Sequence, residues 1–492
     1  METAYYNLAG GINQASTKTE LGLNTKIIYW SDAENIEILE NKGITKQKGN
    51  TLFLELPEQE SITGLHQTEK KLIITTESGK IYIYQNSILS SLEITLNGKN
   101  PIFADFLGGT VIAAEQDSAF YLNSNNEKET VFDNVIPNAI AVYNGRVWIA
   151  SGSTLYYSAL GTYNDFETPD DAGYISDFHT DTADIISIKP YKNYLAIYKE
   201  DKVYLLSGTS PENFAVIPFA DKGCHACKTI TNVENRQYFW NNGIFALEQV
   251  GELNQIQLGS EISLHIKPEF SKFNPAEISN SFALHYEKKN QVWYFFPYAD
   301  DNYYHTVWIN DYVNRAWYKR KIPQNITTAG IFVGNIYTAD DKGKIYKEDF
   351  GTDFNGTPIE FLWKSPFLSI GSAHHRKIID EFYFITDQSY DNNFDFTVYK
   401  DYDSEHPDDT EKIYSVHLEH LIWADDNTSD NLPCHWALDD ENIPIWSVNT
   451  NTLEKAEISE SNYSIQLCIS GREASQSCAI IGLQFREIYN DD

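Results

Sequence analysis

Cysteine is scarce in this chain of 492 residues. The five cysteines are Cys224, Cys227, Cys434, Cys468 and Cys478. An odd, sparse set over this length is no disulfide framework, and it favours folding in a reducing compartment. A chain this long can bury a sizeable core without cross-links, and its length predicts about two to four domains.

Basic residues are also few. The chain has 37 Lys and Arg against 70 Asp and Glu, a formal net charge of −33. Wrapping DNA requires clustered Lys and Arg that neutralise phosphates, so this balance argues against a protein that grips DNA. Contact with DNA along a repelling wall stays open, because like charges act over a screening length of about 8 Å. The acidic excess could equally serve solubility alone.

Long apolar runs are absent, and so is a secretory signal pattern. No apolar stretch approaches about 18 residues, so we expect no membrane insertion. The first residues (METAYYNLAGGINQ) have no basic region followed by an apolar one. We therefore expect that the protein, if it acts outside a cell, leaves by a route other than ordinary secretion.

Catalytic signatures are missing as well. Gly-x-Ser-x-Gly, His-Glu-x-x-His, Walker A and Gly-x-Gly-x-x-Gly do not occur. The repeated Ser-x-Asp-x-Gly-x-x-Trp turns and arginine cluster of a sialidase are also absent, with seven arginines in the whole chain. Paired carboxylates stay open, since 70 acids can always form a pair in space. We predict no enzyme, and no catalytic, cofactor-binding or metal-binding residues.

What the chain does have is aromatic and β-branched residues in a repeated pattern. Aromatics make up 14% of the sequence, which favours strands. The repeat is an apolar strand, a polar turn and a strand ending on an aromatic pair, clearest at residues 71–84 (KLIITTESGKIYIY). The aligned aromatics are Tyr82, Tyr121, Tyr156, Tyr204, Phe245, Trp308 and Tyr346.

The spacing of these aromatics predicts a β-propeller. Successive distances are 39, 35, 48, 41, 63 and 38 residues, and propeller repeats run about 40–50 residues with four strands per blade. The wide gap before Trp308 indicates an insertion or a lost repeat. An irregular array of β-sandwich hairpins is the alternative.

We therefore predict an all-β protein of three parts. Residues 1–60 form an extended N-terminal arm or assembly segment, and residues 61–352 form the propeller-like repeat domain. Residues 353–492 form a C-terminal, sandwich-like β domain, whose start lies within the turn cluster at 350–358. The acidic stretch 401–430 is expected to be exposed loops.

A few clusters could carry a metal or a partner. Cys224-His225-Ala226-Cys227 lacks a second Cys-x-x-Cys, although Cys434-His435 could fold back to it. We predict that Cys224 and Cys227 bind no structural metal. The basic group His374 to Lys377 is interpreted as a solvated strand start, and an ion-pair site for a partner's acidic patch is the alternative. Four acidic pairs lack calcium-loop spacing and are interpreted as solvated turns: Asp300-Asp301, Asp340-Asp341, Asp408-Asp409 and Asp439-Asp440.

Parts of the sequence resemble a known family. Residues 7–13 (NLAGGIN), 30–39 (WSDAENIEIL) and 42–49 (KGITKQKG) resemble the start of phage tail hub or nozzle proteins. Similar strings occur in packaged-DNA stabilisation proteins of short-tailed bacteriophages, matching segments at 145–166, 185–208, 223–224 and 242–245. The resemblance covers roughly residues 7–350. Gln47 departs from it, because the family tends to have Arg there.

The resemblance implies a structural protein of the virion tail, assembled in the host cytoplasm. It implies a homo-oligomeric ring, commonly sixfold, below a portal and adaptor at the end of the DNA channel. Such a ring holds packaged DNA until ejection, touches the genome transiently without adhesion, and carries fibres or a plug. A net acidic inner wall would fit that role. The alternative is a carbohydrate-binding propeller that recognises the host surface, and a generic secreted bacterial β protein is a third option.

Overall fold

The computed structural model describes most of the chain, in two compact units. It describes residues 3–5, 7–17, 21, 26–69, 71–179, 181–250, 255–369, 375–387, 392–407, 409–415, 451–457 and 461–491. One unit consists of Lys48–Val313 with Arg320–Gly356, and the other of Met1–Gln47, Asn314–Lys319 and Thr357–Asp492. No helix in the described ranges is both long and apolar enough to cross a membrane.

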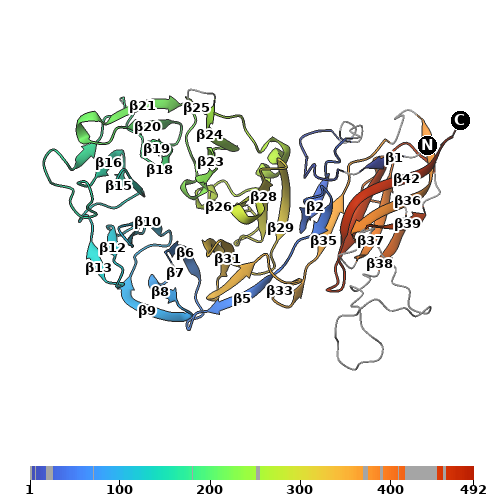
Figure 1. Cartoon of the computed structure of the whole chain (residues 1–492), viewed down its shortest axis with the longest axis horizontal. Coiled ribbons are helices and arrows are strands. Elements are labelled where there is room, and N and C mark those ends of the chain that lie inside the picture. Colours follow the sequence, from blue (N-terminus) through green and yellow to red (C-terminus); the bar gives the residue numbers. More distant parts are fainter. Residues whose placement is uncertain are drawn as a thin grey trace, which may run out of the picture. The chain divides into compact units, whose positions relative to one another are not determined.

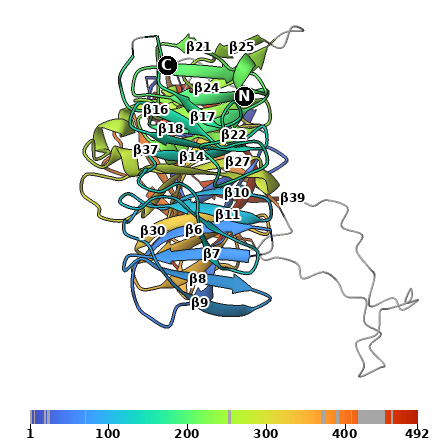
Figure 2. The same cartoon turned by 90° about the vertical axis from the view of Figure 1, so that its left-hand side faces the viewer.

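The larger unit is a β-propeller with seven blades among its described residues (Figure 1). Each blade is a four-stranded antiparallel sheet whose first strand lies at the ring centre. The first three blades are β6 (Ile62–Thr68), β7 (Lys71–Thr76), β8 (Lys80–Gln85), β9 (Ile88–Thr95); β10 (Ile102–Phe106), β11 (Gly109–Ala113), β12 (Phe120–Leu122), β13 (Lys128–Thr130); and β14 (Ala139–Tyr143), β15 (Arg146–Ser151), β16 (Thr154–Tyr157), β17 (Gly173–Ile175). Figure 2 shows the strand order of the first blade, β6 to β9.

The remaining blades follow the same order. They are β18 (Ser187–Tyr191), β19 (Tyr194–Tyr198), β20 (Val203–Ser207), β21 (Ala215–Ala220); β22 (Thr231–Val233), β23 (Arg236–Trp240), β24 (Ile244–Val250), β25 (Gln255–Leu258); β26 (Phe282–Tyr286), β27 (Gln291–Phe295), β28 (Thr306–Asp311), β29 (Ala316–Lys321); and β30 (Ile326–Phe332), β31 (Asn335–Asp340), β32 (Lys344–Glu348), β5 (Asn50–Glu55). Beyond β5 the last sheet continues into β33 (Asp353–Phe354) and β34 (Thr357–Pro358).

The ring closes with a strand from the other end of the repeat region. β5 precedes the first blade in sequence, yet it pairs antiparallel with β32 of the seventh, from Lys344 opposite Glu55 to Glu348 opposite Asn50. A single apolar core then joins the seventh and first blades, in which Tyr337 and Ile345 pack with Ile74 and Tyr82. In a closed ring every blade packs against a neighbour on both sides, so no blade has an uncovered face.

The repeat aromatics occupy equivalent places, as predicted. All seven lie on the third strand of a blade: Tyr82 on β8, Tyr121 on β12, Tyr156 on β16, Tyr204 on β20, Phe245 on β24, Trp308 on β28 and Tyr346 on β32. The wide gap before Trp308 is an insertion, because residues 259–281 carry the 3₁₀ helices η3 (Leu264–Lys272) and η4 (Ile278–Asn280). The other short 3₁₀ helices are η1 (Pro211–Asn213), η2 (Cys227–Thr229) and η5 (Glu287–Lys289). The sandwich-array alternative is wrong for this region.

Tight hairpins join the first two strands of most blades. In six of the seven blades, the last paired residue of the first strand and the first paired residue of the second strand are separated by a turn of only two residues. The first turn residue has positive φ in each: Glu69, Leu107, Asn144, Lys192, Glu234 and Val333. Positive φ at this position matches the twist of the flanking strands, which is why two-residue hairpins adopt it.

The smaller unit is a β-sandwich. One sheet has the order β2 (Asp32–Glu34), β35 (Phe361–Lys364), β41 (Ile465–Gly471), β37 (Asn392–Lys400), β38 (Asp409–Ser415). The other has the order β3 (Ile36–Ile38), β4 (Ile44–Lys46), β42 (Ala479–Asp491), β36 (Arg376–Asp387), β39 (Asn451–Glu457), with β1 (Thr3–Tyr5) on β42 and β40 (Ser461–Asn462) on β36.

Aromatic side chains of the two sheets meet between them. Phe384 of β36 lies 5.4 Å from Phe394 and 4.8 Å from Phe396 of β37, measured between ring centroids. Edge-to-face pairs of this kind are favourable beyond the area they bury. The two sheets therefore share one core.

The observed division differs from the three parts expected. Residues 1–60 were expected to form a separate arm, but β1 to β4, which lie within residues 1–47, are paired into the two sandwich sheets. Each of these strands is three residues long, too short for an alternating pattern to be recognised. β5, also expected in the arm, belongs to the propeller unit.

Candidate functional site

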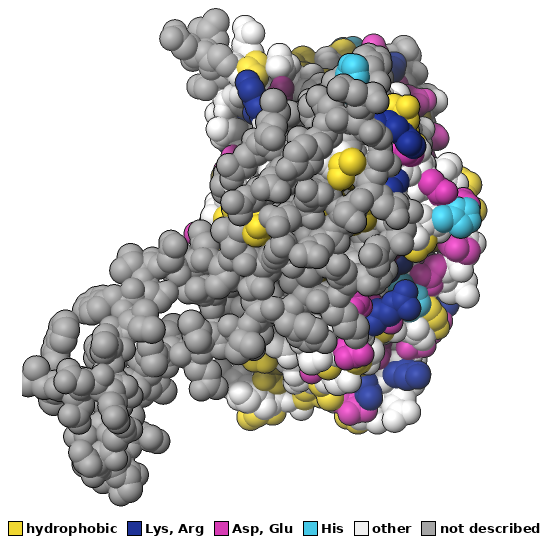
Figure 3. All heavy atoms as spheres, turned by 90° about the vertical axis from the view of Figure 1, so that its right-hand side faces the viewer, with side chains coloured by type: hydrophobic (Ala, Val, Ile, Leu, Met, Phe, Trp, Pro, Cys, Tyr) yellow, Lys and Arg dark blue, Asp and Glu magenta, His cyan; other side chains and the backbone are white. Residues whose placement is uncertain are grey.

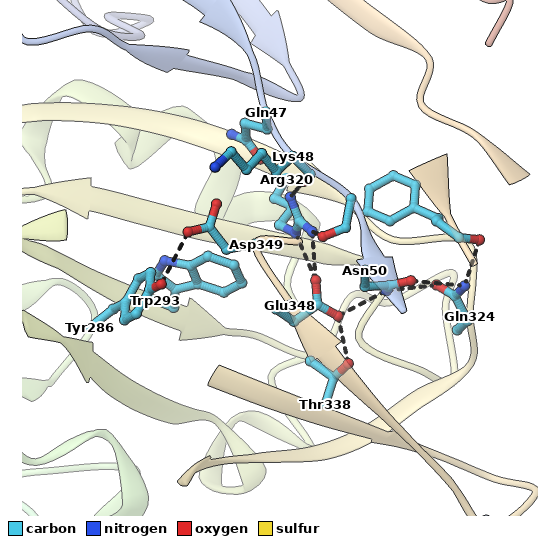
Figure 4. A network of polar contacts seen from close by, with 12 residues as sticks. Gln47, Lys48, Asn50, Tyr286, Trp293, Arg320, Gln324, Thr338, Glu348 and Asp349 are labelled. Atoms are coloured by element: carbon cyan, nitrogen blue, oxygen red, sulfur yellow. Dashed lines mark hydrogen bonds and ion pairs between the residues drawn. The ribbon is translucent and has the colours of Figure 1, made fainter. Parts of the chain in front are cut away.

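An extended network of polar contacts in the propeller surrounds Arg320 (Figure 4). The Arg320 side chain is buried, between the rings of Trp293 at 5.3 Å and Phe354 at 4.9 Å. Its guanidinium donates to the carbonyl oxygens of Lys48 at 2.6 Å and Gly49 at 2.9 Å. These two residues lead directly into β5, so Arg320 holds the incoming end of the closing strand.

Glu348 completes this network from β32. Its Oε2 accepts from Arg320 Nε at 3.1 Å and Nη2 at 2.5 Å. Its Oε1 accepts from Asn50 Nδ2 at 2.9 Å and Thr338 Oγ1 at 2.6 Å. A buried ion pair is tolerated when further hydrogen bonds occupy its remaining atoms, as they do here.

This network is suited to holding structure and poorly suited to proton transfer. Both Glu348 oxygens are engaged by donors, and the side chain is fully buried, so no substrate reaches it. A general base needs a free lone pair within hydrogen-bond reach of a substrate. We therefore interpret the Arg320–Glu348 pair as the ring-closing pair.

Other buried cations in the propeller are likewise engaged. Arg146 bonds Asp171 at 2.5 Å and the Ser158 carbonyl at 2.8 Å. Lys199 lies 3.4 Å from Asp181, which also accepts from the Tyr204 hydroxyl at 2.8 Å. Burial and this bond raise the pKa of Tyr204 to about 12. These groups fix loops between strands.

The Cys-x-x-Cys segment lies between the fourth and fifth blades. Cys224 is buried, and its thiol donates to the Ala226 carbonyl at 3.2 Å. Burial raises the pKa of Cys224 to about 12, so it is a poor metal ligand near neutral pH. Cys227 is partly exposed on η2. Within the described part of the chain, no three His, Cys, Asp or Glu side chains are placed to hold a metal ion, and Cys434 and His435 fall outside it.

The two acidic pairs of the propeller are tied to protein donors. Asp340 is buried and accepts from the backbone N–H groups of Lys342 and Lys344 and from the Tyr346 hydroxyl. Asp341 accepts from Tyr303 and Asn325 at 3.1 Å each. Asp301 binds His305 Nδ1 at 2.7 Å, and Asp300 is exposed. These carboxylates organise turns.

The remaining candidates lie in the sandwich unit. His375 and Arg376 are exposed at the start of β36, and Arg376 lies 5.2 Å from the Tyr463 ring. Nothing is described of the side chains of Lys377 and Asp409. His374, Asp408, Asp439 and Asp440 lie outside the described residues.

The propeller also has a small pocket between its first two blades. Thr68, Lys71, Thr110 and Asn126 are among its lining residues, and its void is about 10 Å³. This is room for about one water molecule. It is too small for a sugar ring.

Sequence reasoning missed the ring-closing pair, although a signal for it was present. Arginine is rare in this chain, and Arg320 stands in a strand, AWYKRK, whose first half is apolar or aromatic and whose residues are buried up to Arg320. A charged residue on a buried strand needs a partner. Only the fold, however, reveals that the partner is Glu348 and that the pair holds β5.

Comparisons with known proteins give only remote likenesses in fold. No protein-family model matches the chain, and no curated protein matches it. YCF48 bound to D1 peptide is similar with a TM-score of 0.41 and 11% identity, covering 66% of this chain and 100% of that one. The WD40 β-propeller domain of Doa1 gives 0.40 and 10%, covering 61% and 96%. BamB from Moraxella catarrhalis gives 0.39 and 11%, covering 64% and 93%.

The protein is a β-propeller. This assignment rests on its own sheet order, ring closure and seven equivalent aromatics.

Proposed function

We propose that this β-propeller protein is a structural component of a bacteriophage tail. It forms a ring, hub or nozzle, at the end of the DNA channel, where it retains packaged DNA and carries fibres or a plug. The observation that carries the proposal is the N-terminal segment 7–49, which resembles the start of tail hub proteins. Within this segment, the described strands β2, β3 and β4 belong to the two sheets of the sandwich unit.

The residues of this segment have definite structural tasks. Trp30 is fully buried, and its indole N–H donates to the Leu8 carbonyl at 2.6 Å. Asn35 adopts positive φ, and its side chain donates to the Glu360 carbonyl at 2.7 Å. Asn is among the few residues that adopt this conformation readily. A shared fold thus accounts for a pattern that includes Trp30 and Asn35.

Gln47 fits the same interpretation despite its departure from the family pattern. Its side-chain Nε2 donates to the Ile36 carbonyl at 2.9 Å and to the Lys319 carbonyl at 3.4 Å. A guanidinium offers donors of the same kind. The departure therefore preserves a donor role.

The proposal includes a lumen of the assembled ring that is net acidic. A wall that gripped phosphates would slow DNA transit, because each neutralised phosphate adds salt-dependent affinity. On the face in Figure 3, Lys and Arg are interspersed with Asp and Glu over the coloured surface. The −33 excess is thus not gathered there as a uniform patch.

The test is the assembly state and the location of the protein. We expect native mass spectrometry of the purified full chain to give a closed oligomer, commonly a hexamer, and negative-stain images to show rings. We also expect gold-labelled antibody against the chain to mark one end of the tail. A protein that stays monomeric and has no location in virions would overturn the proposal, as would a lumen lined chiefly by lysine.

A further inference from the structure

Two side chains of the propeller meet from blades that are not neighbours. Lys228 lies three residues before β22, the innermost strand of the fifth blade, and Asn100 lies two residues before β10, the innermost strand of the second. The Lys228 ammonium donates to Asn100 Oδ1 at 3.4 Å. Because all seven blades have the same strand order, their innermost strands begin at the same face of the ring. In a ring of seven, a contact between the second and fifth blades at that face spans the mouth of the axial channel.

The loop that carries Asn100 is fixed to its own blade. It joins β9 to β10, and the turn between β11 and β12 holds it through two sets of hydrogen bonds. The Asn100 amide donates to the Glu115 carboxylate of that turn. The Asn97 N–H and side-chain amide donate to Asp117 Oδ2 at 2.6 Å and Oδ1 at 2.8 Å. Since the Asn100 amide nitrogen is directed to Glu115, its oxygen is the atom presented to Lys228.

The loop that carries Lys228 is also anchored, and it contains the Cys-x-x-Cys segment. The buried Cys224 thiol donates to the Ala226 carbonyl at 3.2 Å. The Thr229 hydroxyl donates to the Ala226 carbonyl at 2.6 Å and accepts from the Trp240 N–H of β23 at 3.1 Å. The loop is therefore bound to the fifth blade on both sides of Lys228. Its lysine, and neither of its thiols, makes the contact with the second blade.

Opposite charges flank the contact. The Asn100 amide lies between a cation and a carboxylate, with Lys228 on its oxygen and Glu115 on its nitrogen. Hydrogen bonds to ionised groups are stronger than those between neutral groups. Burial lowers the pKa of Lys228, and the negative charges of ionised Cys227 and Glu115 oppose that shift. A carboxylate that attracts this ammonium thus stands on the far blade.

We propose that residues 224–229 form a strut across the ring, which couples the stability of the fifth blade directly to that of the second. Hydrophobic cores of the propeller join neighbouring blades, such as the second with the third and the fourth with the fifth. Through such cores alone, a disturbance of the fifth blade reaches the second only by way of the blades between them. The strut bypasses those blades. The inference goes beyond the proposed tail function and does not depend on it.

Hydrogen exchange of the full chain, measured peptide by peptide, is the first test. Lys228→Met removes the donor and keeps an unbranched side chain. It should speed amide exchange in residues 100–106 of the second blade roughly two- to tenfold, the effect of losing one hydrogen bond. Asn100→Ala should speed exchange in residues 227–233 of the fifth blade by a similar factor, because coupling between two sites is reciprocal. Exchange in residues 139–151 of the third blade should stay at the parent rate in both variants.

Lys99→Met is the matched control. Lys99 adjoins Asn100 in sequence, but its ammonium bonds Glu77 at 2.5 Å, in the turn between β7 and β8 of the first blade. Its loss should therefore leave exchange in residues 227–233 at the parent rate. Lys228→Arg should keep the parent pattern in the second blade, because a guanidinium also donates to the Asn100 oxygen.

Unfolding in denaturant gives a second, independent measure. If the two side chains form one contact, the chain with both Lys228→Met and Asn100→Ala should lose less stability than the sum of the single losses. Additive losses would overturn the strut, and so would parent exchange rates in residues 100–106 of Lys228→Met. Faster exchange throughout the third and fourth blades would contradict it as well, because the coupling would then run through neighbours. Melting temperatures identify a variant that fails to fold, and the comparison of Lys228→Met with Lys228→Arg does not depend on Asn100→Ala.

Discussion

The propeller and the sandwich unit are assembled from the chain in opposite ways. Six of the seven blades are continuous stretches of sequence, and only the seventh takes a distant strand, β5. In the sandwich, neighbouring strands come from opposite ends of the chain, such as β1 beside β42 and β2 beside β35. The propeller is therefore built mainly from contacts between residues close in sequence, whereas the sandwich depends on contacts between residues far apart in sequence. Closing the long loops between such residues costs conformational entropy before any contact forms. The propeller's weak point should therefore be its one long-range strand.

The largest expected effect is at the ring-closing pair. Glu348→Ala leaves the Arg320 guanidinium buried without its carboxylate, so we expect the free energy of unfolding to fall by about 3–5 kcal/mol. Denaturant unfolding of the full chain, followed by tryptophan fluorescence, measures it. Glu248→Ala is the control, since its partner Arg236 is largely exposed, and it should cost about 0–1 kcal/mol. Equal losses in the two variants would show that β5 is not held by this pair.

A substitution in the core of the sandwich unit should destabilise that unit alone. Phe384→Ala removes a fully buried ring between the two sheets and should cost about 3–5 kcal/mol. We expect the loss in the unfolding of the sandwich, with the propeller transition unchanged. Phe384→Leu should lose less, because it keeps most of the apolar contact. Hydrogen exchange measured peptide by peptide distinguishes the two units. Faster exchange in all seven blades of the Phe384→Ala variant would contradict the expectation that the propeller and the sandwich unfold separately.

Gln47 tests the long-range pairing more gently. Gln47→Leu removes the side-chain donor to the Ile36 carbonyl, while the Lys319 carbonyl keeps its hydrogen bond from the Asn35 N–H at 3.0 Å. Loss of this buried side-chain donor should cost about 1–3 kcal/mol. Gln47→Arg should retain more stability, because the guanidinium can donate to both oxygens. Chemical denaturation of the two variants side by side decides this. If Arg were the more damaging residue, the shared donor role would be wrong.

The same contrast explains what could be predicted from sequence. The third-strand aromatics, from Tyr82 to Tyr346, could be aligned because each blade repeats its own local pattern. The place of β5 in the seventh blade could not be predicted, because nothing in the sequence of residues 50–55 indicates that they pair with a strand almost 300 positions away. Strands of three residues, such as β2, show no period at all. For the site, the sequence analysis missed Arg320, because its pairing with Glu348 beside β5 depends on the closed ring.

The smallest expected effect lies in the two-residue hairpins that six of the seven blades share. The third and seventh blades have the turns Asn144-Gly145 and Val333-Gly334, and all four residues have positive φ. Asn adopts this conformation readily, whereas a β-branched residue is strained in it. Val333→Asn should therefore raise the free energy of unfolding by about 0.5–1 kcal/mol, because the exposed Val333 side chain contributes little packing. Asn144→Val should lower it by more than this, since the Asn144 amide also donates to the Gly208 carbonyl at 3.0 Å. Thermal unfolding of both variants measures the asymmetry, and a Val333→Asn chain that is less stable than the parent would show that the blades do not share this turn rule.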